Sequence, residues 1–219
     1  MKNSLLLIAI TIFSLSAFSQ KVDTTYFDKK GRITKLKKAK YKELTTTYDN
    51  GIIETTYYKV KNNVLISSTK MKNDKPIGIW VNNDERGNLL MKRDFDMVVY
   101  TKPHVSDKNK EEYKDTLEGR NVVSPTYGEE GDRLNYMAHN LSYPVEAKES
   151  GAQGTVYITF KVTKEGDVTK LQILRGVDPY LDYEAYRMIS EMGKWKPGTL
   201  DGEPIEMQLN MPIRFILAN

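Results

Sequence analysis

The sequence predicts an α+β C-terminal domain, a three-stranded antiparallel sheet with two helices on one face, preceded by a small all-β meander. Three observations lead to this prediction. Apolar and polar residues alternate strictly over 155–162 and 206–217, which is typical of half-buried strands. A 3.6-residue apolar stripe after Asp178-Pro179 indicates a helix. Between residues 21 and about 100, short strand-like runs alternate with turn signals, without helical periodicity.

Composition excludes several classes of protein. The chain has 219 residues, of which 39% are hydrophobic and 28% charged, as expected for one or two globular domains. It has no cysteine and two histidines, which excludes disulfides and thiolate metal sites. No paired-carboxylate motif, metal-ligand spacing or nucleophile elbow is found, so we expect no catalytic residue, no metal and no cofactor. The net charge of +4 is too small to predict nucleic-acid binding.

Residues 1–19 have the layout of a secretory signal peptide. Lys2 precedes an apolar run, and small residues at Ala17 and Ser19 frame a cleavage site. The fourteen residues of 5–18 would span about 21 Å as a helix, against about 30 Å of bilayer hydrocarbon. We therefore expect export and cleavage near Ser19. The alternative is an inner-membrane anchor formed by residues 5–18 in a locally thinned bilayer.

Residues 21–100 are predicted to form the meander. Asp49-Asn50-Gly51 lies between two strand-like runs and predicts a hairpin. Gly78-Ile79-Trp80, followed by Gly87-Asn88-Leu89, resembles one unit of a MORN-type repeat. The alternative is an unrelated small sheet with Trp80 in its core.

Lysine and arginine are concentrated at the start of the meander. Residues 21–45 hold nine basic and three acidic residues. Such a stripe can attract anionic lipid or wall polymer, and it is also typical of a solvated strand face or a guarded sheet edge. Residues 101–122 are polar and are predicted to be a linker.

Residues 123–219 are predicted to fold as helix, hairpin, helix and strand. A helix over 133–141 ends before Pro144. The strands 155–162 and 168–175 are joined by a tight turn at 164–167. Asp178 caps the second helix, and Pro179 is its first residue. The helix stripe is Leu181, Ala185, Met188, Met192 and Trp195, and the six apolar residues expected to be buried on the last strand are Met207, Leu209, Met211, Ile213, Phe215 and Leu217.

Pro212 indicates that the last strand has one unpaired edge. Proline has no N–H to donate and is confined within sheets to edges, strand ends or bulges. A long regular edge strand is a hazard unless a partner is meant to pair there. We therefore expect β-augmentation, in which a partner peptide adds as a further strand. The alternative is that Arg214 and a neighbouring helix shield the edge.

Residues 123–219 resemble the C-terminal domain of TonB, the energy-transducing protein of two-membrane bacteria. The resemblance rests on these stretches, in order along the chain: Asn140-Leu141-Ser142-Tyr143-Pro144, Ala147, Gly151-Ala152-Gln153-Gly154-Thr155-Val156, Phe160-Lys161-Val162, Arg175-Gly176-Val177-Asp178-Pro179, Leu181-Asp182, Glu184-Ala185, Lys194-Trp195-Lys196-Pro197-Gly198, Gly202 and Met211-Pro212-Ile213-Arg214-Phe215.

This resemblance implies a partner, the short N-terminal box of a TonB-dependent outer-membrane receptor plug, and a location in the periplasm. The box pairs with the last strand and touches the segment before the Tyr-Pro pair, where Asn140 stands in place of the family's glutamine. The partner-binding residues expected on this basis are Asn140, Leu141, Ser142, Tyr143, Gln208, Asn210, Pro212 and Arg214.

The start of the chain departs from the pattern of a force transducer. Such a protein is tethered in the inner membrane beside a motor complex and carries a proline-rich spacer, whereas 103–122 holds no proline run. We therefore expect receptor binding in energised transmembrane transport, but not energy transduction by this chain alone. Further partners are the motor complex, other TonB-like chains, or a second copy paired through the last strand. The alternative function is an envelope structural protein whose meander binds wall polymer or another protein.

Overall fold

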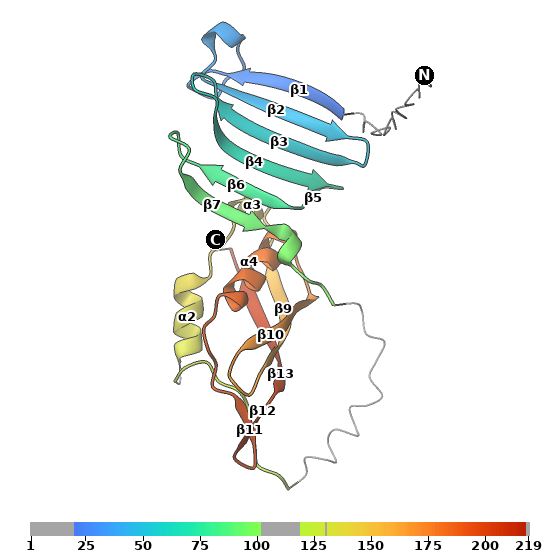
Figure 1. The fold of residues 1–219 in the computed structure, drawn as a ribbon, viewed down its shortest axis with the longest axis vertical. Coiled ribbons are helices and arrows are strands. Elements are labelled where there is room, and N and C mark those ends of the chain that lie inside the picture. Colours follow the sequence, from blue (N-terminus) through green and yellow to red (C-terminus); the bar gives the residue numbers. More distant parts are fainter. Residues whose placement is uncertain (1–19, 102–118, 130, 218–219) are drawn as a thin grey trace, which may run out of the picture. The chain divides into compact units, whose positions relative to one another are not determined.

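The computed structural model describes residues 20–101, 119–129 and 131–217 (Figure 1). The chain divides into two compact units: the first holds the residues up to Asp74 together with Val81–Lys92, and the second holds Lys75–Trp80 together with Arg93–Asn219. The predicted signal peptide, residues 1–19, lies outside the described residues. Residues 102–118 of the predicted linker also lie outside them. Within the described ranges, no helix is long and apolar enough to cross a bilayer.

The N-terminal sheet confirms the predicted all-β meander. Its strands are β1 (Gln20–Phe27), β2 (Tyr41–Tyr48), β3 (Ile52–Lys59), β4 (Val64–Lys72), β5 (Lys75–Pro76), β6 (Ile79–Asn83) and β7 (Leu89–Asp94). They follow the order β1-β2-β3-β4-β6-β7, with β5 paired to β4. The expected hairpin at Asp49–Gly51 joins β2 to β3. Two short 3-10 helices, η1 (Leu36–Lys38) and η2 (Phe95–Met97), accompany the strands.

The described part of the first unit contains no fully buried hydrophobic side chain. Its strands form a single layer whose apolar residues stay half-buried or exposed. A one-layer sheet leaves both of its faces without a second layer to bury against. Trp80 is buried, but it groups with the second unit rather than with a core of the meander.

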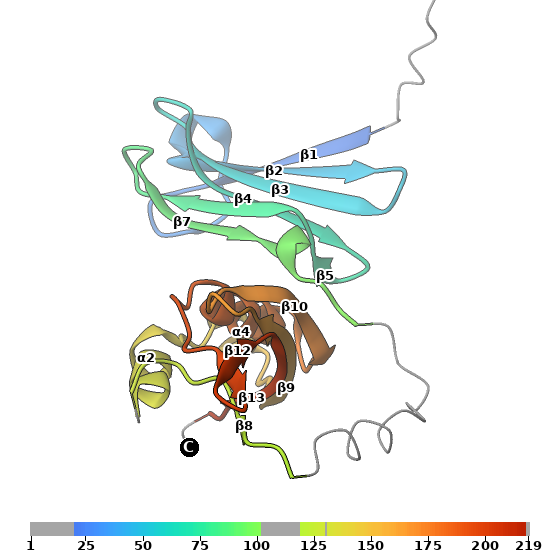
Figure 2. The same ribbon diagram turned by 60° about the horizontal axis from the view of Figure 1, so that its bottom comes forward.

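The second unit contains a three-stranded antiparallel sheet of order β10-β9-β13, which confirms the predicted α+β domain (Figures 1 and 2). The strands are β9 (Gly154–Val162), β10 (Val168–Arg175) and β13 (Met207–Phe215), and the helices are α2 (Asp132–Asn140), α3 (Val145–Glu149) and α4 (Pro179–Ser190). A smaller sheet of order β12-β11-β8 contains β8 (Val122–Val123), β11 (Gly198–Leu200) and β12 (Glu203–Ile205).

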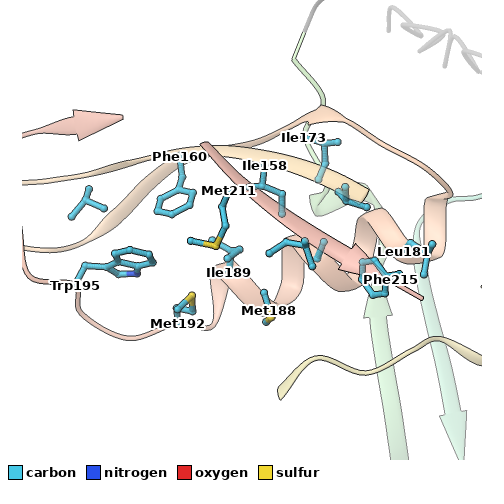
Figure 3. Close-up of a cluster of buried hydrophobic side chains, with 14 of the residues drawn as sticks. Ile158, Phe160, Ile173, Leu181, Met188, Ile189, Met192, Trp195, Met211 and Phe215 are labelled. Carbon is cyan, nitrogen blue, oxygen red and sulfur yellow. The ribbon is translucent and has the colours of Figure 1, made fainter. Parts of the chain in front are cut away.

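The core lies between the sheet and α4 (Figure 3). Ile158, Phe160 and Met211 point from the strands toward Met188 and Ile189 on the helix. All five are buried, and β9 contributes a continuous buried row at alternate positions. Each such side chain contributes about 1.5–3 kcal/mol by leaving water, so this layer supplies most of the stability of the unit.

Helix α4 begins and packs as the sequence predicts. The Asp178 carboxylate accepts from the N–H groups of Tyr180 and Leu181 at 2.9 and 3.4 Å and caps the helix. The predicted stripe is buried throughout, and its members are Leu181, Ala185, Met188, Met192 and Trp195. The tight turn before β10 depends on Gly166. Its φ is 84°, and a Cβ there would collide with the carbonyl oxygen of Trp195.

One expectation for this unit is wrong, and the structure adds detail to two others. The last strand buries three apolar side chains rather than six, because Met207 and Leu209 lie toward one end of the sheet and Leu217 lies beyond it. Helix α2 ends at Asn140 and buries no residue. Pro144 does more than stop that helix, since it is the N-cap of α3, which the sequence did not predict.

Residues 93–101 belong to the second unit, although the sequence assigns 93–100 to the meander and 101 to the linker. Phe95 and Trp80 pack edge to face, and Phe95 also lies 5.7 Å from the ring of Tyr180 and 4.9 Å from that of Tyr183. The two tyrosines project from α4. This helix is therefore covered on two sides, by the sheet and by aromatic residues that precede it by more than eighty positions.

A buried carboxylate connects α4 to the same segment. Asp182 is 4% exposed, and its oxygens accept from the N–H of Val177 at 2.8 Å and the hydroxyl of Tyr100 at 2.9 Å. Burial raises the pKa of Asp182, although these hydrogen bonds oppose the shift. Gly176 must be a glycine here, because a Cβ would collide with this carboxylate.

The raised pKa of Asp182 predicts a pH-dependent difference in stability. A carboxyl whose pKa is raised by folding stabilises the protein fully below its unfolded pKa, and the contribution is lost as pH rises through the folded pKa. Relative to Asp182→Asn, the wild type is therefore expected to gain unfolding free energy as pH falls from 7 to 4. Urea unfolding of both proteins at pH 7, 5 and 4 measures this difference. The unfolding free energy of the wild type minus that of Asp182→Asn should rise as pH falls. A fall in this quantity toward pH 4 would contradict the prediction.

Candidate functional site

Strand β13 lies at the edge of the C-terminal sheet. It pairs with β9 without a break, from Met207 opposite Val162 to Phe215 opposite Gly154. Among the described residues, no strand pairs with its other side. Nine residues of regular strand therefore present one vacant side, as the prediction from Pro212 requires.

One side-chain hydrogen bond establishes which backbone groups face outward. The hydroxyl of Thr159 on β9 donates to the carbonyl oxygen of Leu209 at 3.2 Å, so this carbonyl points toward β9. The N–H and C=O of one residue point to the same side of an antiparallel strand, and successive residues alternate. The backbone groups of the even-numbered residues therefore point to the vacant side. These residues are Gln208, Asn210, Pro212 and Arg214.

Pro212 interrupts the row of outward donors. The vacant side offers the N–H groups of Gln208, Asn210 and Arg214, together with four carbonyls, and has no donor at Pro212. The four side chains are exposed on the face of the sheet opposite the core. Arg214 makes no ion pair within the described part of the chain, so its charge is available to an acidic partner.

The opposite edge of the sheet is covered. The N–H of Thr101 donates to the carbonyl of Ile173 at 2.9 Å, and the N–H of Ile173 donates to the carbonyl of Val99 at 2.7 Å. Tyr100 and Ile173 thereby form a parallel bridge on β10. Residues 99–101 thus occupy the β10 edge at Ile173, whereas β13 has no backbone partner along its outer side among the described residues. The sequence did not predict this cover, because two residues of parallel pairing have no recognisable pattern.

The segment Asn140–Tyr143 lies at one end of β13. The ring of Tyr143 packs edge to face on Phe215 at 5.6 Å, and its hydroxyl donates to the carbonyl of Ala152. The predicted residues of this segment therefore lie near Arg214. Gln208 is at the other end of the strand, about 20 Å away at about 3.3 Å per residue. The structure does not gather the predicted residues into one pocket: Tyr143 contacts the buried Phe215, whereas the side chains of the even-numbered β13 residues lie on the exposed face.

Two charged residues of α4 hold the segment in place. Glu184 is 6% exposed, and one of its oxygens accepts from the backbone N–H of Ser142 at 2.7 Å and from the Ser142 hydroxyl at 3.1 Å. Arg187 donates to both Glu184 oxygens, at 2.8 and 2.9 Å, and also to the carbonyl of Asn140 at 2.7 Å. The hydrogen bonds to Glu184 and its charge raise the pKa of Arg187, so the guanidinium stays protonated.

The sequence did not identify this pair as part of the site. Glutamate three residues before arginine on a helix is usually a solvated surface pair. Only the fold shows that Ser142 and Asn140 lie against it. Glu184 and Arg187 are therefore positioning residues for the candidate site.

Removing the charge of Glu184 is expected to loosen the segment. Both carboxylate oxygens of Glu184 accept hydrogen bonds, whereas the amide of Glu184→Gln has only one oxygen that can accept. Arg187 also loses its charged partner. Breaking such a buried pair costs about 3–5 kcal/mol. We expect amide hydrogen exchange to increase more at Ser142, which loses its acceptor, than at Ile158 in the core. Glu191→Gln is the matched control, because Glu191 pairs with the same arginine but is exposed. Equal exchange at Ser142 in both variants would contradict the assignment.

One family of known proteins is similar to this part of the chain. A family model described as Gram-negative bacterial TonB protein C-terminal matches residues 139–217, a range that begins just before the Asn140–Tyr143 segment and includes all of β13. A search of the curated proteins and a search of the solved structures each find no match. The match supports a TonB-like domain at this end of the chain. The matched family is one of transport and energy-transducing proteins rather than enzymes.

Proposed function

We propose that this chain is a periplasmic TonB-like protein that binds TonB-dependent outer-membrane receptors by β-strand addition and takes part in energised transport of solutes. The observation that carries the proposal is the vacant side of β13, beside an opposite edge that residues 99–101 cover. The residues proposed to bind the receptor box are Asn140, Leu141, Ser142, Tyr143, Gln208, Asn210, Pro212 and Arg214.

The energetics suit a contact that forms and releases. A partner strand that makes about five backbone hydrogen bonds gains about 1 kcal/mol net from each. With a few side-chain contacts, the affinity reaches roughly the micromolar range. Pro212 has no N–H to donate to a partner strand. The missing donor favours a register in which no carbonyl of the partner faces Pro212.

Calorimetric titration of the chain from Gln20 to Asn219 with synthetic receptor-box peptides tests the proposal. Each peptide is also tested in two N-methylated forms. One form is methylated on the amides that would face β13, and the other on the amides that would face away from it. Saturable binding that only the first modification abolishes supports strand addition. Absence of binding at millimolar peptide, or equal loss with both modified peptides, contradicts it.

A second copy of this chain is the alternative occupant of the same edge. Two antiparallel β13 strands would give a symmetric dimer. In that case the meander would supply the function, as an envelope protein that binds wall polymer or a protein partner. Sedimentation velocity across a hundredfold range of concentration detects the dimer, and sedimentation with isolated wall sacculi detects polymer binding.

A further inference from the structure

The first unit contains a cleft of about 500 Å³ lined mainly by basic residues. Its lining residues are Asp28, Lys29, Arg32, Lys38, Ala39, Lys40, Lys59, Val60 and Lys61. They come from three places in the chain: the loop after β1, the region of η1, and the end of β3 with its following turn. Six of the nine are basic and one is acidic.

Hydrogen bonds of the backbone fix the walls of this cleft. The Asp28 carboxylate accepts from the N–H groups of Lys30 and Arg32 at 2.7 and 3.1 Å and closes the loop after β1. The N–H of Lys40 donates to the carbonyl of Phe27 at 2.8 Å, and the N–H of Val60 donates to the carbonyl of Lys40 at 2.9 Å. The backbone segments that carry the lysines are therefore hydrogen-bonded to one another at the ends of β1 and β3.

Ion pairing leaves three ammonium groups of the cleft without a partner. Arg32 donates from Nε and Nη2 to one oxygen of Asp28, at 2.9 and 2.6 Å, which pairs its charge. Lys40 and Lys59 both bind Glu85, at 2.9 and 3.0 Å, and together with Tyr41 they lower the pKa of Glu85 to about 2. Lys29, Lys38 and Lys61 make no ion pair within the described residues.

The charges do not balance in the folded chain. Six basic residues face Asp28 and Glu85, so the cleft and its ion pairs carry a net charge of six minus two, +4. Like charges held close together repel, and the repulsion opposes the compact state. The arrangement is therefore poorly explained by stability of the meander, and it suits an anionic ligand.

We propose that this cleft binds a ligand that carries two or more phosphate groups on a small polar ring, as in a phosphorylated sugar headgroup. Lysine ammonium groups bind phosphate as point charges. The volume lies within the usual range of small-ligand sites. Ala39, Val60 and the lysine methylene stems supply an apolar wall for a ring. The shared chemistry is the phosphorylated headgroup, either free or on a lipid.

Two probes distinguish the free from the lipid-borne source. Calorimetry in 150 mM NaCl with fructose 1,6-bisphosphate measures binding of a free sugar bisphosphate. Flotation with phosphatidylcholine vesicles that contain phosphatidylinositol 4,5-bisphosphate in a 19:1 ratio, against phosphatidylcholine alone, measures binding to a phosphorylated ring carried on a lipid. Saturable binding to either probe supports the site and identifies the source. Absence of binding to both overturns it.

A pair of triple variants separates the site from general electrostatics. Lys29→Gln, Lys38→Gln and Lys61→Gln together remove the three unpaired ammonium groups of the cleft. Lys30→Gln, Lys35→Gln and Lys37→Gln together remove the same charge from exposed lysines that do not line it. We expect the first triple variant to weaken binding at least about tenfold and the second to change it less than about twofold. Equal weakening by the two triple variants, with circular dichroism showing both folded, overturns the proposal.

Discussion

Replacing Asn210 by proline is expected to weaken binding of a receptor-box peptide by about 5- to 100-fold while the domain stays folded. The N–H of Asn210 points to the vacant side of β13, so its loss removes no hydrogen bond to β9. A bound partner strand would instead keep a carbonyl without a donor, which costs about 1–3 kcal/mol. Pro212 already occupies the equivalent position two residues further along the same strand.

Two controls define this experiment. Asn210→Ala removes the side chain but keeps the backbone N–H, and its affinity is expected to stay within about threefold of the wild type. Met211→Pro removes an N–H that points toward β9 and is expected to destabilise the sheet. Calorimetry gives the affinities, and urea unfolding gives the stabilities. If Asn210→Pro binds like Asn210→Ala, the partner does not pair with this edge.

Replacing Phe95 by alanine is expected to lower the unfolding free energy of the C-terminal unit by about 3–5 kcal/mol. Phe95 is 8% exposed and lies between Trp80, Tyr180 and Tyr183. Its loss leaves a cavity beside α4, the helix that also contributes Leu181, Ala185, Met188 and Ile189 to the core. The effect is notable because Phe95 precedes the family-matched range by more than forty residues.

Tryptophan fluorescence during urea unfolding measures this effect selectively. The chain has two tryptophans, Trp80 and Trp195, and both belong to the C-terminal unit. Phe27→Ala is the matched control, because Phe27 packs on Tyr57 in the first unit. We expect it to leave the tryptophan transition unchanged. If Phe95→Ala shifts that transition no further than Phe27→Ala does, segment 93–101 does not stabilise the unit. A fragment that begins at residue 123 lacks this segment, so binding is best measured on the longer chain.

Local patterns of the sequence were sufficient for the elements that carry the proposed function. The alternation of 155–162 and 206–217 identifies the strands that the structure places at 154–162 and 207–215, because side chains of a strand point in turn to opposite faces. Asp178-Pro179 marks the start of α4 because the cap and the fixed φ of proline act within a single turn. Pro212 indicates the vacant edge because a missing N–H is a property of the residue itself.

The features that the sequence left undetermined depend on residues that are distant in the chain. The sequence places Phe95 and Trp80 in the predicted meander, but in the structure both pack against Tyr180 of α4. Glu184 and Arg187 resemble an ordinary surface pair until Ser142 is brought beside them. Packing of this kind has no period along the chain, so no pattern predicts it.

The sequence by itself determined the α+β domain, its last strand and the absence of a donor at Pro212, since each follows from propensities that act over a few residues. Only the tertiary structure decided that residues 99–101 cover the β10 edge, that α4 anchors Asn140 and Ser142, and that Lys29, Lys38 and Lys61 line one cleft. These three arrangements depend on contacts between separate segments, whose geometry exists only once the chain has folded.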